Sequence, residues 1–160
     1  MPSQILCKNF MNAENAIHRE KTMPTEMIKI NIPITWKRLK NTSGAPYRWG
    51  DGKSHVTDSN WSKLNVIYRW VKNSTGETAE IGETERRLTE RVNNYISASP
   101  GSSAGPTNKK VFNEQQRLSQ KNDYLYLEFA EDVSGYNLND NRERKLAESL
   151  LIGYYKPYLQ

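Results

Sequence analysis

Residues 64–82 read LNVIYRWVKNSTGETAEIG and contain the pattern that decides the fold. The run at 64–71 is rich in β-branched and aromatic residues, which favour a strand. Turn-forming residues follow, and TAEIG at 78–82 has the composition of a short second strand. Two such runs joined by a turn rich in Asn, Ser and Gly predict a β-hairpin over residues 65–82.

After the hairpin the chain alternates between helical patterns and one further strand. The expected elements are a helix, a loop, a polar helix, a strand and a long C-terminal helix, at 84–96, 97–110, 110–121, 124–132 and 140–155. Thr84 is expected to cap the first helix, and Pro157 to follow the end of the last. This order predicts an α+β fold with a small antiparallel sheet.

Residues 1–63 are predicted to form an N-terminal extension of a core at 64–160. Apolar residues alternate with polar ones over 28–36, which indicates a half-buried strand, and Pro33 favours the edge of a sheet. The loop-like segment that follows carries Tyr47 and Trp49 in a basic setting. Those aromatic side chains either pack on the core or contact a nucleic acid.

The composition narrows the function classes. The chain has 160 residues and a net charge of +5, which favours a polyanionic partner. Its single cysteine excludes an internal disulfide, and with two histidines beside it a structural zinc site is not expected. No apolar run has the length of a membrane span or of a signal peptide, so we expect a cytoplasmic protein that does not bind membranes.

Three polar residues interrupt apolar patterns. Arg91 falls on the apolar stripe of its helix, Glu148 precedes apolar residues at helical spacing, and Tyr68 lies within an apolar strand. Burying a charge is costly unless it is paired, so Arg91 and Glu148 each need a reason to be there. They either form a structural salt bridge with each other or belong to a site.

These residues also carry a resemblance to a known family. The residues concerned are VIY (66–68), EIG (80–82), Arg91, Tyr95 and Glu148 with the LIGYYKPYLQ that closes the chain. In this order they resemble the GIY-YIG nuclease superfamily, in which the late glutamate begins E-x-x-L-I-x-x-Y-x-P-x-x-N. Gln160 stands in the place of the final asparagine, and the match runs from about residue 65 to the C-terminus.

The resemblance implies a central three-stranded antiparallel sheet flanked by helices, and hydrolysis of nucleic-acid phosphodiesters with Mg²⁺ or Mn²⁺. By the family's pattern Tyr68 is the general base or positions the nucleophile, and Arg91 holds the scissile phosphate. Glu148 is the metal ligand, and Tyr95 contacts a phosphate oxygen or the attacking water. Arg91, not Arg87, is assigned because the four-residue step to Tyr95 is the family's own.

The main departure from the family's pattern is Glu80, where the second motif usually begins with tyrosine. Three explanations are open: a second metal ligand or a base that replaces the phenol, a partner of Arg87 or Lys72, or an impaired site. Further phosphate or DNA contacts are expected from residues on the surface around the site. They are Arg86, Arg87, Lys109, Lys110 and Gln160.

The length of the chain favours a self-contained nuclease, and a type II restriction-like enzyme acting on double-stranded DNA fits best. Segments 45–54 and 99–110 are then either DNA-reading elements or plain loops. Cutting both strands requires a homodimer or sequential nicking. The alternatives are a phage, mobile-element or repair-type endonuclease of low specificity, and a DNA-binding protein that has lost catalysis.

Overall fold

A four-stranded antiparallel sheet organises the residues that the computed structural model describes, 31–49 and 59–160. The hairpin strands are β2 (Val66–Lys72) and β3 (Thr78–Thr84), and β4 (Leu125–Ala130) lies on the other side of β2. The strand order is β1-β4-β2-β3, which leaves β3 at one edge. The α+β class and the hairpin predicted from the sequence are therefore confirmed.

The fourth strand comes from the N-terminal segment and was not part of the expected three-stranded sheet. Strand β1 (Lys37–Arg38) pairs with β4, with Lys37 opposite Phe129. The strand predicted over 28–36 is described only from residue 31 onwards, where Ile34 forms an isolated bridge to Val133. The alternation still has its physical basis, because Ile32, Ile34 and Trp36 pack against one side of the core.

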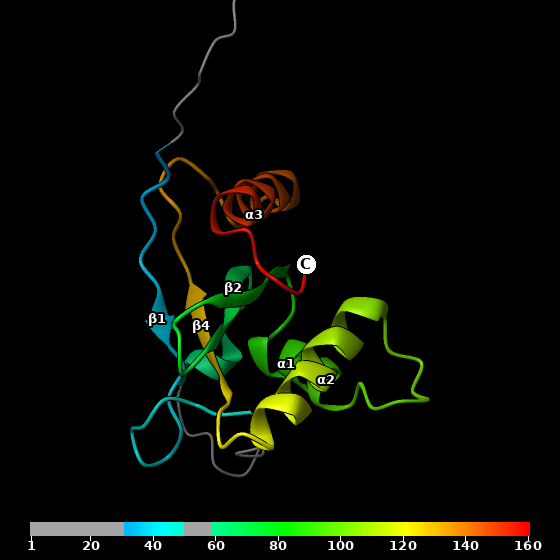
Figure 1. Ribbon diagram of the computed structural model, residues 1–160. Coiled ribbons are helices and arrows are strands. Elements are labelled where there is room, and N and C mark those ends of the chain that lie inside the picture. Colours follow the sequence, from blue (N-terminus) through cyan, green and yellow to red (C-terminus); the bar gives the residue numbers. More distant parts are fainter. Residues whose placement is uncertain (1–30, 50–58) are drawn as a thin grey trace, which may run out of the picture. The chain divides into compact units, whose positions relative to one another are not determined.

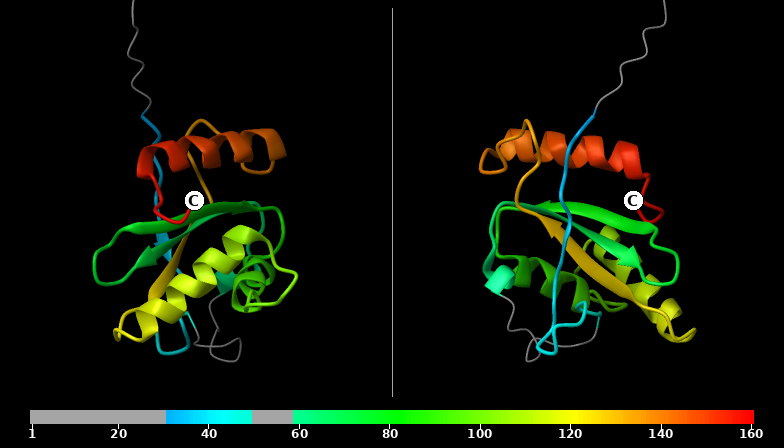
Figure 2. Two further views of the ribbon diagram at one scale, coloured as in Figure 1. Left: turned by 45° about the vertical axis from the view of Figure 1, so that its right-hand side comes forward. Right: turned by 90° about the vertical axis from the view of Figure 1, so that its left-hand side faces the viewer.

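Helices cover both faces of the sheet. Helices α1 (Leu88–Ile96) and α2 (Pro106–Ser119) lie on one face, and α3 (Asn141–Tyr155) lies on the other (Figures 1 and 2). A short 3₁₀ helix, η2 (Ser59–Ser62), packs against α1. None of the helices in the described residues is long and apolar enough to cross a membrane.

The predicted cap of the first helix is wrong. Thr84 is the last residue of β3, and α1 begins four residues later, at Leu88. The Thr84 hydroxyl accepts a hydrogen bond from the Arg86 backbone N–H at 3.0 Å, which stabilises the turn between strand and helix. Helix α2 also begins earlier than expected, because Pro106 fits the first helical turn, where no N–H is needed.

The two faces of the sheet have separate apolar clusters. Tyr68 and Trp70 point to the side of α1 and α2, and Ile67 and Ile81 point to the side of α3. Alternate strand residues face opposite sides, so Gly82, which pairs with Tyr68, lies on the α1 side. A Cβ at position 82 would overlap the hydroxyl and ring of Tyr68, so only glycine lets the ring lie against β3.

We expect Gly82→Ala to destabilise the protein by about 1–3 kcal/mol, the usual cost of overpacking a core, because the ring of Tyr68 has to move. Gly153→Ala is the matched control, since Gly153 is exposed in α3 and a Cβ there meets no atom. That change should stabilise the helix by about 0.5–1 kcal/mol. Chemical denaturation of both variants measures the difference, and equal stabilities would contradict the close approach of Tyr68.

Candidate functional site

Four polar side chains from three elements meet on the α1 side of the sheet. Tyr68 comes from β2, Glu80 from β3, and Arg91 and Tyr95 from α1. Glu80 lies opposite Trp70 in the β2–β3 register, so it shares a face with Tyr68. Tyr95 is one helical turn beyond Arg91, which places both side chains toward the sheet.

These side chains form one hydrogen-bonded cluster. The Tyr95 hydroxyl donates to Oε1 of Glu80 at 2.5 Å and lies 2.9 Å from the hydroxyl of Tyr68. Arg91 donates from Nε to the Tyr68 hydroxyl at 2.6 Å and from Nη2 to the Tyr95 hydroxyl at 3.0 Å. Residues separated by up to 27 positions in the sequence therefore share one polar network.

The cluster is buried, with one atom left unpaired. Tyr68 and Tyr95 are inaccessible to solvent, and Glu80 is 2% exposed. Oε2 of Glu80 has no hydrogen-bond partner among the described residues. Burial raises the pKa of Glu80 to about 7, although the Tyr95 hydrogen bond and the Arg91 charge act against the rise. Glu80 therefore changes its charge near neutral pH.

Arg91 has a further partner that the sequence did not indicate. Its Nη1 donates to Oδ1 of Asn108, in the first turn of α2, at 3.2 Å. The bonds to Tyr68, Tyr95 and Asn108 use three of the five N–H groups of the guanidinium, and the side chain is half-buried. The remaining N–H groups are suited to an anion. No motif points to Asn108, because its role depends on the packing of α2 against α1.

Glu148 reaches the open edge of β3 from the other side of the sheet. It lies on α3, is half-buried, and its carboxylate accepts a hydrogen bond from the backbone N–H of Glu83. Burial and the charge of Glu83 raise the pKa of Glu148, while Arg91 acts in the opposite direction. The proposed salt bridge between Arg91 and Glu148 is not formed, since the ion pairs of the described residues do not include it.

Gln160 binds the same edge of β3. Its side-chain amide accepts from the Ile81 N–H at 3.1 Å and donates to the Ile81 carbonyl at 3.2 Å. The preceding Leu159 donates its backbone N–H to Ala79. Together with Glu148, these contacts occupy outward-facing backbone groups of an edge strand, which otherwise invite pairing with another chain. The amide of Gln160 is therefore engaged by the protein's own backbone.

A fully buried arginine, Arg144 of α3, was missed by the sequence reasoning. It is 1% exposed and forms an ion pair with Glu83 at 2.5 Å. It also donates to the backbone carbonyl of Leu138 at 2.8 Å and to Asn141 at 3.1 Å. Arg144 thus joins α3 to β3, one helical turn before Glu148.

Glu80 pairs with neither of the basic residues considered for it. Its carboxylate bonds Tyr95, and ion pairs of Glu80 with Arg87 or Lys72 are absent from the described part of the chain. Arg86 and Arg87 are exposed at the start of α1. Lys109 and Lys110 directly follow Asn108 in the first turns of α2, with Lys109 half-buried and Lys110 exposed.

The aromatic residues of the segment before residue 50 pack on the core. Tyr47 is buried and contacts Trp61 edge-to-face, with ring centroids 4.8 Å apart. Trp49 lies against Trp70 at 5.1 Å and against Phe112 at 6.2 Å. Of the two alternatives for these side chains, the structure favours packing; residues 50–54 of the expected reading segment lie outside the described residues.

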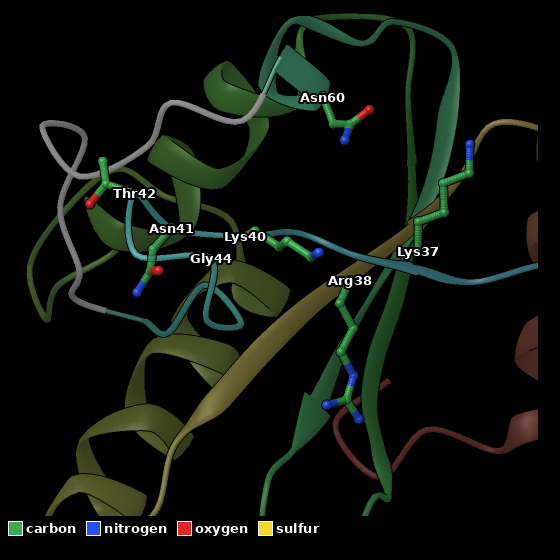
Figure 3. Close-up of a pocket in the computed structure, with 7 residues that line it drawn as sticks. All are labelled: Lys37, Arg38, Lys40, Asn41, Thr42, Gly44 and Asn60. Atoms are coloured by element: carbon green, nitrogen blue, oxygen red, sulfur yellow. The ribbon is translucent and has the colours of Figure 1, made fainter.

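A basic surface hollow lies beside β1. Its lining combines three cationic side chains with polar residues from the following turn and from η2: Lys37, Arg38, Lys40, Asn41, Thr42, Gly44 and Asn60 (Figure 3). Lys37 forms an ion pair with Glu131 at 2.7 Å, and Arg38 with Glu128 at 3.2 Å. The lining itself contains no carboxylate, so the hollow presents cationic and amide groups to an approaching ligand.

The divalent metal that the resemblance implies requires oxygen ligands. The described residues hold no group of three acidic, histidine or cysteine side chains close enough to form a metal site. Glu148 alone fits, because Mg²⁺ is commonly held by one or two carboxylates, with water and substrate oxygens completing its shell. No Lys or Arg nitrogen of residues 31–49 and 59–160 forms an ion pair with Glu148, which leaves its charge available to a cation.

Comparisons of the chain with models of protein families, with curated proteins and with solved structures find no significant match. The resemblance to the GIY-YIG superfamily therefore stays a prediction that depends on the residues of this chain.

The buried Glu80 predicts a pH-dependent stability. Its pKa in the fold is about 7, against 4.5 for an ordinary glutamate, so its contribution is fully present below about pH 4.5 and is lost as the pH rises through 7. The difference corresponds to about 3 kcal/mol. Thermal unfolding between about pH 5 and pH 9 should therefore show a steeper loss of stability for the wild type than for Glu80→Gln.

Glu114→Gln is the control for this measurement. Glu114 is also buried and also accepts from a tyrosine, Tyr158, but its hydrogen bond to Arg117 lowers its pKa. Its titration lies below the tested range, so this variant should keep the wild-type slope. Parallel curves for the wild type and Glu80→Gln would show that Glu80 does not titrate near neutrality.

Proposed function

We propose that this protein is a metal-dependent endonuclease that hydrolyses DNA phosphodiester bonds on a fold of the GIY-YIG type. The observation that carries the proposal is the cluster of Tyr68, Arg91, Tyr95 and Glu80, with the carboxylate of Glu148 at the adjacent strand edge. Packing of the core alone does not require two hydrogen-bonded phenols next to a half-exposed arginine. A site that holds a phosphate beside a proton acceptor requires such groups.

Arg91 is the phosphate-binding residue in this proposal. Tyr68, Tyr95 and Asn108 fix its guanidinium without supplying a carboxylate to neutralise it. Its positive charge can therefore stabilise the negative charge that builds up on the phosphate oxygens during hydrolysis. Fixed N–H donors are most effective at that stage of the reaction. The basic residues at the starts of α1 and α2 are proposed to contact neighbouring phosphates of the same strand.

Glu148 would hold the divalent metal, which supplies neutralisation of the charge on the leaving oxygen. The protein's own part is to place this carboxylate. The Glu83 backbone N–H binds it, and the ion pair of Arg144 with Glu83 joins the same strand to α3. Tyr68 positions the attacking water and receives its proton.

A DNA-binding protein without nuclease activity is the second candidate, and one observation favours it. The hydroxyls of Tyr68 and Tyr95 are buried beneath Arg91, so a water molecule reaches them only after Arg91 shifts. Such a protein would bind DNA through the same basic surface and leave it intact. Digestion of plasmid DNA separates the two candidates.

We expect the wild type to cut supercoiled plasmid DNA in the presence of Mg²⁺ or Mn²⁺, and Glu148→Gln and Arg91→Lys each to lose about 10²–10³-fold in rate. Glutamine cannot supply the negative charge for a metal, and lysine cannot reproduce the forked donors of arginine. Initial rates of conversion from supercoiled to nicked and linear DNA provide the measurement. Discrete fragments would indicate site specificity, and a smear would indicate low specificity.

Glu114→Gln serves as the control with unchanged cleavage. Glu114 of α2 bonds Arg117 of the same helix and Tyr158 of the C-terminal segment, and none of these residues belongs to the cluster. Circular dichroism establishes that each variant is folded. Wild-type protein that shifts DNA without cutting it, over a range of metals, would support the second candidate. Cleavage that survives Glu148→Gln would show that the metal ligand is elsewhere.

The hollow beside β1 is proposed to contact the DNA backbone, and salt dependence tests this. Lys37→Gln combined with Lys40→Gln should weaken binding and reduce the slope of log K against log salt by about 2, since each phosphate contact contributes about 0.9. Arg38 is left in place because its partner Glu128 is buried, whereas Glu131, the partner of Lys37, is more exposed and keeps its ion pair with Lys63. Lys121→Gln with Lys156→Gln, two exposed lysines outside the hollow, is the control; equal slopes for both pairs would exclude the hollow.

A further inference from the structure

Glu80 is reached from the rest of the site through the hydroxyl of Tyr95. Its Oε1 accepts from that hydroxyl at 2.5 Å, and the hydroxyl of Tyr68 lies 2.9 Å from the hydroxyl of Tyr95. We infer that Glu80 is the terminal proton acceptor of the site, receiving the proton of the attacking water through Tyr68 and Tyr95. This inference rests on the proposed nuclease function and gives the departure from the family's tyrosine a role.

The hydrogen bonds determine the direction of the relay. An ionised carboxylate only accepts, so the proton of Tyr95 points to Glu80. The Tyr95 oxygen then accepts from Tyr68, because its own proton is already used. Arg91 donates to both phenolic oxygens and accepts from neither. Tyr68 keeps one lone pair, which can receive a proton from a water molecule once Arg91 has shifted to admit it.

Neither phenol can hold the negative charge itself. Burial and the charge of Glu80 raise the pKa of Tyr68 far above its usual value, and burial also raises the pKa of Tyr95. Arg91 is a permanent cation and cannot take a proton. Among the members of the cluster only the carboxylate of Glu80 is able to accept one near neutral pH.

The step balances in atoms and charge. The oxygen of water forms a bond to phosphorus, and the bond from phosphorus to the leaving oxygen breaks. The leaving oxygen departs with the electron pair of that bond and takes a proton from solvent. The proton of the water passes to the Tyr68 oxygen as the Tyr68 proton passes to Tyr95 and the Tyr95 proton to Oε1 of Glu80. Both tyrosines end neutral, Glu80 ends as a carboxylic acid, and its proton returns to solvent before the next turnover.

The surroundings of Glu80 suit an acceptor that is ionised only part of the time. Tyr95 and Arg91 of α1 stabilise its charge, and Glu148 of α3 opposes it. Trp70 lies directly opposite on β2, and its indole N–H has no partner among the described residues. Tyr68 faces it from the same strand. The relay therefore requires a pH above the point at which Glu80 loses its proton.

The test is the pH dependence of DNA cleavage by the full-length wild type, Glu80→Gln and Tyr95→Phe. The wild-type rate should rise with pH to a plateau, with its midpoint near 7. Glu80→Gln should lose about 10²–10⁴-fold, the usual contribution of a general base, together with this inflection. Glutamine still accepts a hydrogen bond from Tyr95. If Glu80 only held Tyr95 in place, Glu80→Gln would therefore cleave DNA at close to the wild-type rate.

The double variant Glu80→Gln/Tyr95→Phe tests whether the two residues act as one unit. Members of a single relay are strongly non-additive, so the double variant should be no slower than the slower single one. Glu114→Gln removes the charge of another buried glutamate that accepts a hydrogen bond from a tyrosine. This variant should keep both the wild-type rate and the wild-type pH profile.

The outcomes separate the relay from the nuclease function. Wild-type cleavage with an unchanged rate and profile in Glu80→Gln overturns the relay and leaves the nuclease. Multiplicative losses in the double variant also overturn it, because the residues then act independently. Absence of wild-type cleavage at every pH, with Mg²⁺ and with Mn²⁺, overturns both.

Discussion

The approach of the Tyr68 ring to the backbone of Gly82 is the constraint on which the site depends. Because position 82 has no Cβ, the ring lies against β3 and its hydroxyl reaches Tyr95 and Arg91 of α1. Any larger residue would push the ring away from the strand and toward the helix. The hairpin register, which places Tyr68 opposite Gly82, therefore also determines where α1 can pack.

Glu80 is the member of the cluster whose burial opposes folding. A buried carboxylate with one hydrogen-bonded oxygen and one unpaired oxygen opposes folding once it is ionised. Arg91 reduces this penalty by its charge without forming an ion pair with Glu80. A fold selected for stability alone would place an apolar residue there, so the carboxylate is best understood through the chemistry proposed for it.

Contacts at the edge of β3 both stabilise the sheet and position a residue of the site. In an open sheet the outward N–H and C=O groups of an edge strand need partners. Here Leu159 and Gln160 supply them at one end, and Glu148 accepts from Glu83 at the other. The contacts that protect the edge therefore also hold Glu148 beside the cluster, so the C-terminal helix contributes to both.

The sequence by itself determined the hairpin, the α+β class and the inward direction of Tyr68 and Arg91, because these follow from local composition and from the periods of strand and helix. Only the tertiary structure decided the pairs that join distant elements: Glu80 with Tyr95, Arg91 with Asn108, and the edge contacts of β3. The cost of burying a charge suggested a salt bridge between Arg91 and Glu148, and packing instead placed tyrosines around the arginine. Local pattern says which way a side chain points, whereas its partner depends on how helices and strands far apart in the chain pack together.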